Sequence, residues 1–162
     1  MVFKREAAMT SPSLAGFIGW HKKTLFMPND ESIVCFFFQP KPAGEPSLYD
    51  ENHNVFRLNA KGEVIWQVRR DDSNHPSNWW DILHAHARAR GEDGARWPFT
   101  YFELKYPDGS TNNSPQTGSP PNEAVWTPDC TIWLTGSAYQ EYILDPETGI
   151  AKNVTEGRPR PW

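Results

Sequence analysis

The pattern of apolar and polar positions along the chain predicts strands over most of its length. The most apolar run, residues 33–38, shows no alternation with polar residues, so both of its faces are expected to be buried, as in a central strand. Further strands are expected at 15–20, 24–27 and 99–106, because apolar and β-branched or aromatic residues gather there between turn residues.

Two segments have the pattern of a tight β-hairpin. In each, an aromatic-x-Leu strand runs into a turn that begins with Asn or Asp and closes with Gly. The first is Phe56-Arg57-Leu58-Asn59-Ala60-Lys61-Gly62, followed by strand 64–68; the second is Tyr142-Ile143-Leu144-Asp145-Pro146-Glu147-Thr148-Gly149, followed by strand 150–154. Gly adopts positive φ in such turns and Asn or Asp caps them, so both segments are predicted hairpins.

The strands before the two hairpins also correspond, which divides the chain into two similar halves at about 15–70 and 97–155. The sequence therefore predicts a mainly β (β-rich α+β) fold with two antiparallel sheets of about four strands, packed as a sandwich or half-open barrel. We expect a single domain over residues 14–155 and an extended C-terminal tail over 156–162. Residues 1–13 are expected to be a flexible N-terminal segment, in which Met1 and Met9 are both possible initiators.

One segment between the halves, at about 77–90, has the pattern of a helix. Ser77 is expected to cap it and Gly91 to end it, and Trp80, Leu83 and Ala87 form an apolar stripe that would face the sheet. The alternation of Ala with His and Arg over 84–90 also suits a strand, which leaves an all-β barrel without a helix as the alternative. Residues 40–54 and 110–122 are predicted loops, because Pro, Gly, Ser and Asn dominate them.

The two hairpins resemble a blade of the quinoprotein-type β-propellers, in which a Leu-Asp-x-x-Thr-Gly-x-x-x-Trp pattern recurs. Leu144-Asp145-Pro146-Glu147-Thr148-Gly149 matches the turn of this pattern, and Leu58, Asn59, Gly62 and Trp66 follow both parts of it loosely. Two copies cannot close a ring of typically four to eight blades. The resemblance therefore supports the hairpin architecture and implies neither a quinone cofactor nor an activity for this chain.

Composition and charge restrict the classes of function. The 162 residues suit one domain, and 15 Pro, 8 Trp and 14% aromatic residues favour strands joined by loops. A net charge of −4 argues against a nucleic-acid partner, and the run Arg69-Arg70-Asp71-Asp72 is expected on a solvated surface. No apolar stretch reaches the roughly 20 residues of a membrane span. With no apolar signal segment at the N-terminus, we expect a cytoplasmic protein.

The two cysteines, Cys35 and Cys130, both lie in apolar strand-like runs. In a reducing compartment such residues are free thiols inside the protein, which is the preferred interpretation. A disulfide between equivalent strands of the two halves is the alternative.

A candidate metal site lies on the predicted helix. Asp81 and His84 are i, i+3 neighbours there, and together with His86 they would serve a metal-dependent hydrolase. His84 and His86 point to opposite sides of a helix, however, and share a face only on a strand. The sequence contains no His-Glu-x-x-His motif, nucleophile elbow or phosphate-binding Gly-rich loop. Surface or capping roles for these residues are preferred, and no cofactor is expected.

Four tryptophans are the candidate binding residues. Trp79, Trp80, Trp97 and Trp126 lie at element ends or in loops, where aromatic rings stack on sugars or bases or anchor a protein interface. The alternative is that they fill the core between the two halves.

These patterns define three functional hypotheses. The first is a non-enzymatic protein-interaction module of the inhibitor or immunity type, whose partner is another protein. The second is a β-module that binds a carbohydrate or another small ring-shaped ligand through the loop tryptophans. The third is the metal-dependent hydrolase with Asp81, His84 and His86. In each case we expect the functional residues outside the hairpins, in 71–98 and 107–128.

Overall fold

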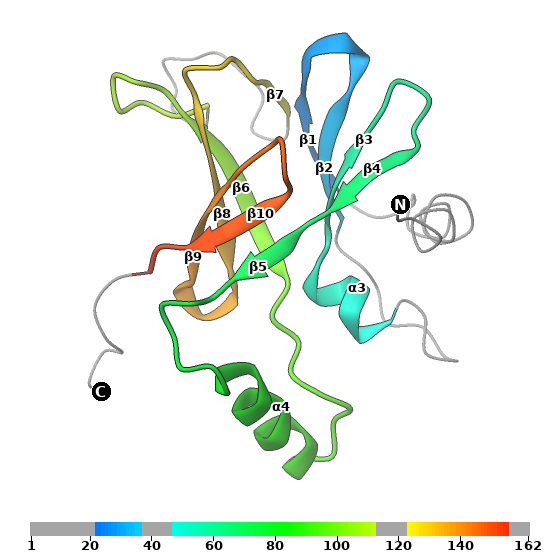
Figure 1. Cartoon of the computed structure of the whole chain (residues 1–162), viewed down its shortest axis with the longest axis vertical. Helices are drawn as coiled ribbons and strands as arrows, with labels where there is room; N and C mark the ends of the chain where they lie inside the picture. Colours follow the sequence, from blue (N-terminus) through cyan, green and yellow to red (C-terminus); the bar gives the residue numbers. More distant parts are fainter. Residues whose placement is uncertain (1–21, 37–46, 113–122, 156–162) are drawn as a thin grey trace.

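Two β-sheets and two short helices make up the part of the chain that the structure describes (Figure 1). The structure is a computed structural model, and it describes residues 22–36, 47–112 and 123–155. The first sheet contains β1 (Lys22–Phe26), β2 (Ser32–Phe36), β3 (Val55–Leu58), β4 (Val64–Gln67) and β7 (Glu123–Val125), in the order β4-β3-β2-β1-β7. The second contains β5 (Arg69–Asp71), β6 (Phe99–Lys105), β8 (Thr131–Gly136), β9 (Glu141–Leu144) and β10 (Ile150–Asn153), in the order β5-β10-β9-β8-β6.

Each sheet holds four antiparallel strands, as predicted, and a fifth strand that makes it mixed. β7 pairs parallel to β1, with Thr24 opposite Glu123, and β5 pairs parallel to β10, with Arg69 opposite Ile150. The expectation of purely antiparallel sheets is therefore wrong at one edge of each sheet. These two strands have three residues each, which is too short for an alternating pattern, and each crosses to the sheet built by the other half of the chain.

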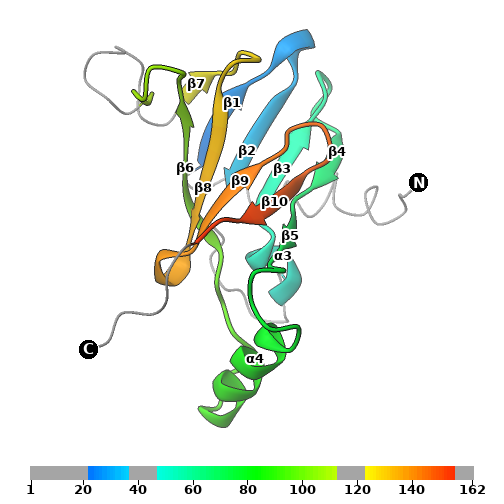
Figure 2. The same cartoon turned by 60° about the vertical axis from the view of Figure 1, so that its left-hand side comes forward.

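The core lies between the two sheets, which face each other without closing into a barrel (Figure 2). The burial of both faces of β2 explains why its sequence does not alternate between apolar and polar residues. Ile33 and Cys35 join the core between the sheets, while Val34 and Phe36 join a second buried cluster with Phe56 on the opposite face. The predicted burial of both faces is thus confirmed for residues 33–36; residues 37 and 38 lie outside the described residues.

Both predicted hairpins form with the expected turn chemistry. The side chain of Asn59 accepts hydrogen bonds from the backbone N–H groups of Lys61 and Glu63, at 2.8 and 2.9 Å. In the second hairpin, Asp145 accepts one from the N–H of Glu147 at 2.9 Å. Gly62 and Gly149 have φ of 83° and 79°, a conformation in which a side chain is strained. That the two halves are a repeat stays a prediction.

Helix α4 (Trp79–Ala89) occupies the segment where the sequence predicts a helix. It ends as predicted, because Gly91 follows it with a φ of 90°. Its beginning differs: Asn78 is the N-cap and provides no side-chain hydrogen bond, so the predicted cap by Ser77 is wrong. The helix lies beyond one end of the two sheets (Figures 1 and 2). The apolar stripe of Trp80, Leu83 and Ala87 is only partly buried, and Ala87 is its one fully buried residue.

A second helix, α3 (Leu48–Asn52), lies inside the segment 40–54 that the sequence predicts to be a loop. Ser47 caps it, since its hydroxyl accepts a hydrogen bond from the N–H of Asp50 at 3.1 Å. Two 3-10 turns, η2 (Pro28–Asp30) and η4 (Ser137–Tyr139), join strands. Neither helix is of the length and apolar character that crossing a membrane requires. The predicted N-terminal segment, strand 15–20, most of loop 110–122 and the C-terminal tail lie outside the described residues.

Candidate functional site

A pocket of about 790 Å³ lies between α3 and the segment that leads from β5 into α4. One part of its wall is α3 with the residue after it, and the other is the segment 72–84; β5 joins the two. The lining residues are Leu48, Tyr49, Asn52, His53, Arg69, Arg70, Asp72, Ser73, His75, Pro76, Ser77, Trp79, Trp80 and His84. Most of them belong to the insert 71–98 between the halves.

Two pairs of stacked rings line the pocket, one from each part of the wall. Tyr49 and His53 stack with ring centroids 3.8 Å apart and an angle of 11°, and His75 and Trp79 stack at 3.9 Å and 7°. Each pair is four residues apart in the sequence. Ring pairs held in this way present fixed aromatic surfaces to the pocket.

The imidazole of His53 is neutral. Burial lowers its pKa to about 4, and the hydrogen bond to the backbone carbonyl of Tyr49, at 2.7 Å, opposes this shift only in part. A carbonyl oxygen only accepts, so in the neutral ring Nδ1 carries the proton and donates to it. The ring therefore contributes a stacking surface without a charge.

Three of the four candidate tryptophans lie together. Trp79 contacts Trp80 and Trp97 edge to face, with centroid distances of 5.5 Å in both cases, and Trp80 lies 6.0 Å from Trp97. Trp79 and Trp80 line the pocket, whereas Trp97 supports them from behind. Trp126 follows β7 at the other end of the sheets, where it packs against the core between them.

Arg70 is held beneath these rings. Its guanidinium donates to the hydroxyl of Tyr142 at 2.7 Å and to the carbonyls of Asn52 and Trp97. It also lies 5.2 Å from the ring centre of Trp80. Burial lowers the pKa of Arg70, yet a guanidinium stays protonated. The expectation that this residue is solvated is wrong, because its partners come from α3, from the segment before β6 and from β9.

Asp72 fixes the position of Trp80. Its two carboxylate oxygens accept hydrogen bonds from the indole N–H of Trp80 at 2.7 Å, the hydroxyl of Tyr142 at 2.7 Å and the amide of Asn153 at 2.9 Å. The hydroxyl of Tyr142 thus accepts a hydrogen bond from Arg70 and donates one to Asp72. Burial raises the pKa of Tyr142, so this hydroxyl keeps its proton.

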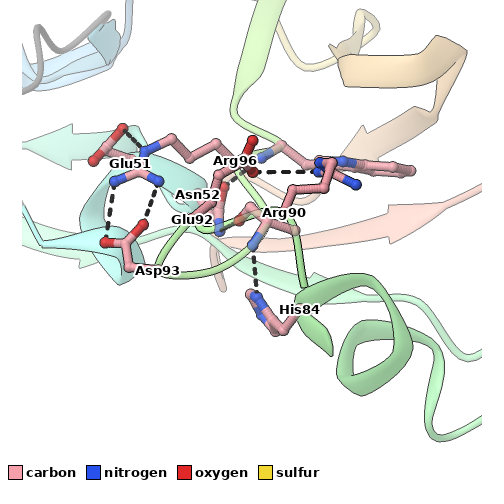
Figure 3. Close-up of polar contacts among 9 residues, drawn as sticks. Glu51, Asn52, His84, Arg90, Glu92, Asp93 and Arg96 are labelled. Carbon is pink, nitrogen blue, oxygen red and sulfur yellow. Dashed lines mark hydrogen bonds and ion pairs between the residues drawn. The ribbon is translucent and has the colours of Figure 1, made fainter. Parts of the chain in front are cut away.

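The segment that precedes β6 ties the two helices together (Figure 3). The side-chain amide of Asn52 donates to the carbonyl of Ala95 at 2.9 Å, and its oxygen accepts from the N–H of Trp97 at 2.6 Å. Arg96 pairs with Glu51 at 3.0 Å. These contacts join the segment to α3 and hold the backbone of Trp97 next to Asn52, while the N–H of Ala95 also donates to His84 of α4.

The candidate metal ligands are not brought together. Asp81 and His86 are exposed on α4, while His84 lines the pocket and its Nδ1 accepts a hydrogen bond from the N–H of Ala95 at 2.9 Å (Figure 3). Over residues 22–36, 47–112 and 123–155, no group of three or more His, Cys, Asp or Glu side chains could hold a metal ion.

Several pocket residues were not identified from the sequence. Tyr49 lies in α3 and His53 directly follows it; the signal for this helix was the pattern Ser47-x-x-Asp50, a spacing typical of a helix start. Arg70 and Asp72 lie in a run of charges that has the pattern of a solvated turn, and no local signal distinguishes them.

Comparisons with protein-family models, with curated proteins and with solved structures found no match for this chain.

Proposed function

We propose that the protein is a binding module whose pocket between α3 and α4 takes a small ring-shaped ligand. The observation that carries this proposal is the presence of two stacked ring pairs, Tyr49–His53 and His75–Trp79, on different segments that line one pocket. Its volume of about 790 Å³ falls within the roughly 300–1,000 Å³ of pockets that hold small molecules.

The rings are held in place before any ligand arrives. Asp72 accepts from the indole of Trp80, Trp97 packs against Trp79 and Trp80, and the imidazole of His53 is bonded to the backbone of α3. A pocket whose side chains are already ordered loses less conformational entropy when a ligand binds. This arrangement favours binding through aromatic stacking, which was one of the hypotheses drawn from the tryptophans.

Calorimetry against a panel of sugars, nucleosides and fused-ring compounds tests the proposal, with Trp79→Ala and Trp126→Phe compared with the unmodified protein. We expect binding of at least one ring class and a loss of about tenfold or more in Trp79→Ala, the size of one stacking contact. Trp126→Phe is the matched control, because Trp126 packs against the core away from the pocket. Equal losses in the two variants, or no binding of any ring class, would contradict the proposal.

A protein-interaction function of the inhibitor or immunity type is the second candidate. One observation favours it: Phe26 and Val125 lie opposite each other on the neighbouring strands β1 and β7, with 44% and 64% of their surfaces exposed. Exposed apolar side chains that adjoin at the edge of a sheet suit a protein partner. This function is supported if a partner copurifies with the protein from the native host and no longer copurifies with the Val125→Glu variant. A partner that still copurifies with the variant argues against a binding role for this sheet edge.

A further inference from the structure

We propose that the ring-shaped ligand carries a negatively charged group, a carboxylate or a phosphate, and that Arg69 binds it. This inference rests on the proposed ring-binding function and adds the chemical class of the ligand. It follows from the charges that line the pocket.

The pocket is more positive than the protein as a whole. Its lining contains Arg69, Arg70 and Asp72, while the net charge of the chain is −4. His53 adds no charge, because its imidazole is neutral. Arg70 and Asp72 are linked through the hydroxyl of Tyr142 and compensate each other. The positive charge that is left in the lining is that of Arg69.

Arg69 is available for a ligand. Its side chain is exposed and makes no hydrogen bond or ion pair with another side chain or carbonyl in the described part of the chain. Its backbone, by contrast, is fixed, because its N–H donates to the carbonyl of Gly149 at 2.9 Å and β5 pairs with β10. A guanidinium on a fixed backbone matches the planar geometry of carboxylate and phosphate oxygens.

Arg70 does not have this role. Its Nε, Nη1 and Nη2 atoms already donate to Asn52, Tyr142 and Trp97. With four of the five N–H donors of its guanidinium occupied, it supports the pocket from beneath and leaves ligand binding to its neighbour.

The charges also exclude the other common use of clustered aromatic rings, which is to enclose a cation such as a quaternary ammonium. Arg70 already places a cation 5.2 Å from the ring centre of Trp80. A cationic ligand would be repelled by the charge of Arg69, whereas an anionic ring compound gains from both the ring faces and this charge.

Calorimetry with matched pairs of ring compounds tests this inference. The pairs are 1-naphthoate with 1-naphthamide and adenosine 5′-monophosphate with adenosine, and naphthyltrimethylammonium is the cationic probe. We expect the anion of at least one pair to bind about tenfold more tightly than its neutral partner, the size of one charge-assisted hydrogen bond. The pair that shows the preference identifies the group as carboxylate or phosphate.

Arg69→Gln should abolish that preference, because it weakens binding of the anion far more than binding of the neutral compound. Lys152 is an exposed cation on β10 outside the pocket lining, so Lys152→Gln should leave both affinities unchanged. Equal affinity for anion and neutral partner, tightest binding of the cation, or an Arg69→Gln variant that keeps the preference overturns this inference while ring binding stands. If no ring compound binds at all, the proposed function fails, and this inference fails with it.

Discussion

The indole ring of Trp66 occupies the space that a side chain at Gly149 would need. A Cβ atom at position 149 would lie 2.6 Å from Cδ2 of the indole, which is well inside van der Waals contact. The indole N–H donates to the carbonyl of Pro146 at 2.9 Å, and Arg57 donates to the same carbonyl at 2.8 Å. The turn of the second hairpin is thus packed onto the first hairpin, which joins the two sheets.

This contact predicts that Gly149→Ala destabilises the protein more than Gly109→Ala does. Both glycines have positive φ, 79° and 91°, but a Cβ at Gly109 would meet no atom within 4 Å. Gly109→Ala should therefore cost only the backbone strain, about 1 kcal/mol. Gly149→Ala should cost about 1–3 kcal/mol more, because the indole must move. Urea unfolding measures the free energy of unfolding of both variants. Equal losses of stability would show that the indole of Trp66 moves aside without destabilising the protein.

Asp72→Asn is expected to lower the free energy of unfolding by about 3 kcal/mol or more, because the variant leaves the buried charge of Arg70 uncompensated. The substitution keeps the shape of the side chain but replaces one acceptor oxygen by a donor, so either Trp80 or Tyr142 and Asn153 lose their acceptor. Urea unfolding gives the loss of stability, and the tryptophan emission of the native state should shift.

The matched control for this change is Asp71→Asn. Asp71 accepts a hydrogen bond from the N–H of Ser73 at 3.1 Å, which an Asn side chain also accepts, so this variant should keep the stability of the parent. If Asp71→Asn lost as much stability as Asp72→Asn, the effect would come from the turn and not from the hydrogen bonds that link Asp72 to Trp80, Tyr142 and Asn153.

His53 makes stability depend on pH. Its pKa is about 4 in the folded protein against about 6.5 in an unfolded chain. Between these values the unfolded state binds more protons, so stability is full above pH 6.5 and decreases as the pH falls toward 4, by up to about 1.4 kcal/mol per pH unit. Urea unfolding from pH 7 to pH 5 should show a shallower slope in His53→Gln, and the parent slope in His86→Gln. Identical slopes in all three proteins would contradict this prediction.

The two thiols, which are unpaired in the structure, should differ in reactivity. Cys35 is fully buried and burial raises its pKa to about 12, whereas Cys130 is only half-buried. A thiol reagent should modify one cysteine in the native protein and a second only in denaturant, because the thiolate is the reacting species. Native Cys130→Ser should then show no modification. Rapid labelling of that variant would mean that the core around Cys35 opens readily.

Elements with local signals were predicted well. The hairpins at Asn59–Gly62 and Asp145–Gly149 depend on turn residues that act within a few positions, and α4 is bounded by Gly91. The failures concern β5 and α3, which have three and five residues, and the parallel pairing of β7 with β1. Such elements form because distant strands or helices pack against them, and a short sequence window contains no trace of those partners.

The structure describes the positions of the candidate tryptophans, while their role in binding stays a prediction. The rings of Trp79, Trp80 and Trp97 do lie together, and Trp79 and Trp80 line the pocket within the insert that the hairpin pattern set apart. The roles of Arg70 and Asp72 could not be predicted, because Tyr142, which links them, comes from a strand some seventy residues away. Adjacent opposite charges in a sequence are typical of solvated turns, and only the fold encloses these two.

The exchange of β5 and β7 between the sheets has a consequence for the order of folding. Thr24 pairs with Glu123 and Arg69 with Ile150, so each pair forms only after the many residues between its partners have been synthesised. Contacts between residues so far apart in sequence close long loops, which slows folding. A fragment that stops before β7 would leave β1 as an exposed edge able to pair with another copy, so we expect the growing chain to need protection until β7 has been synthesised.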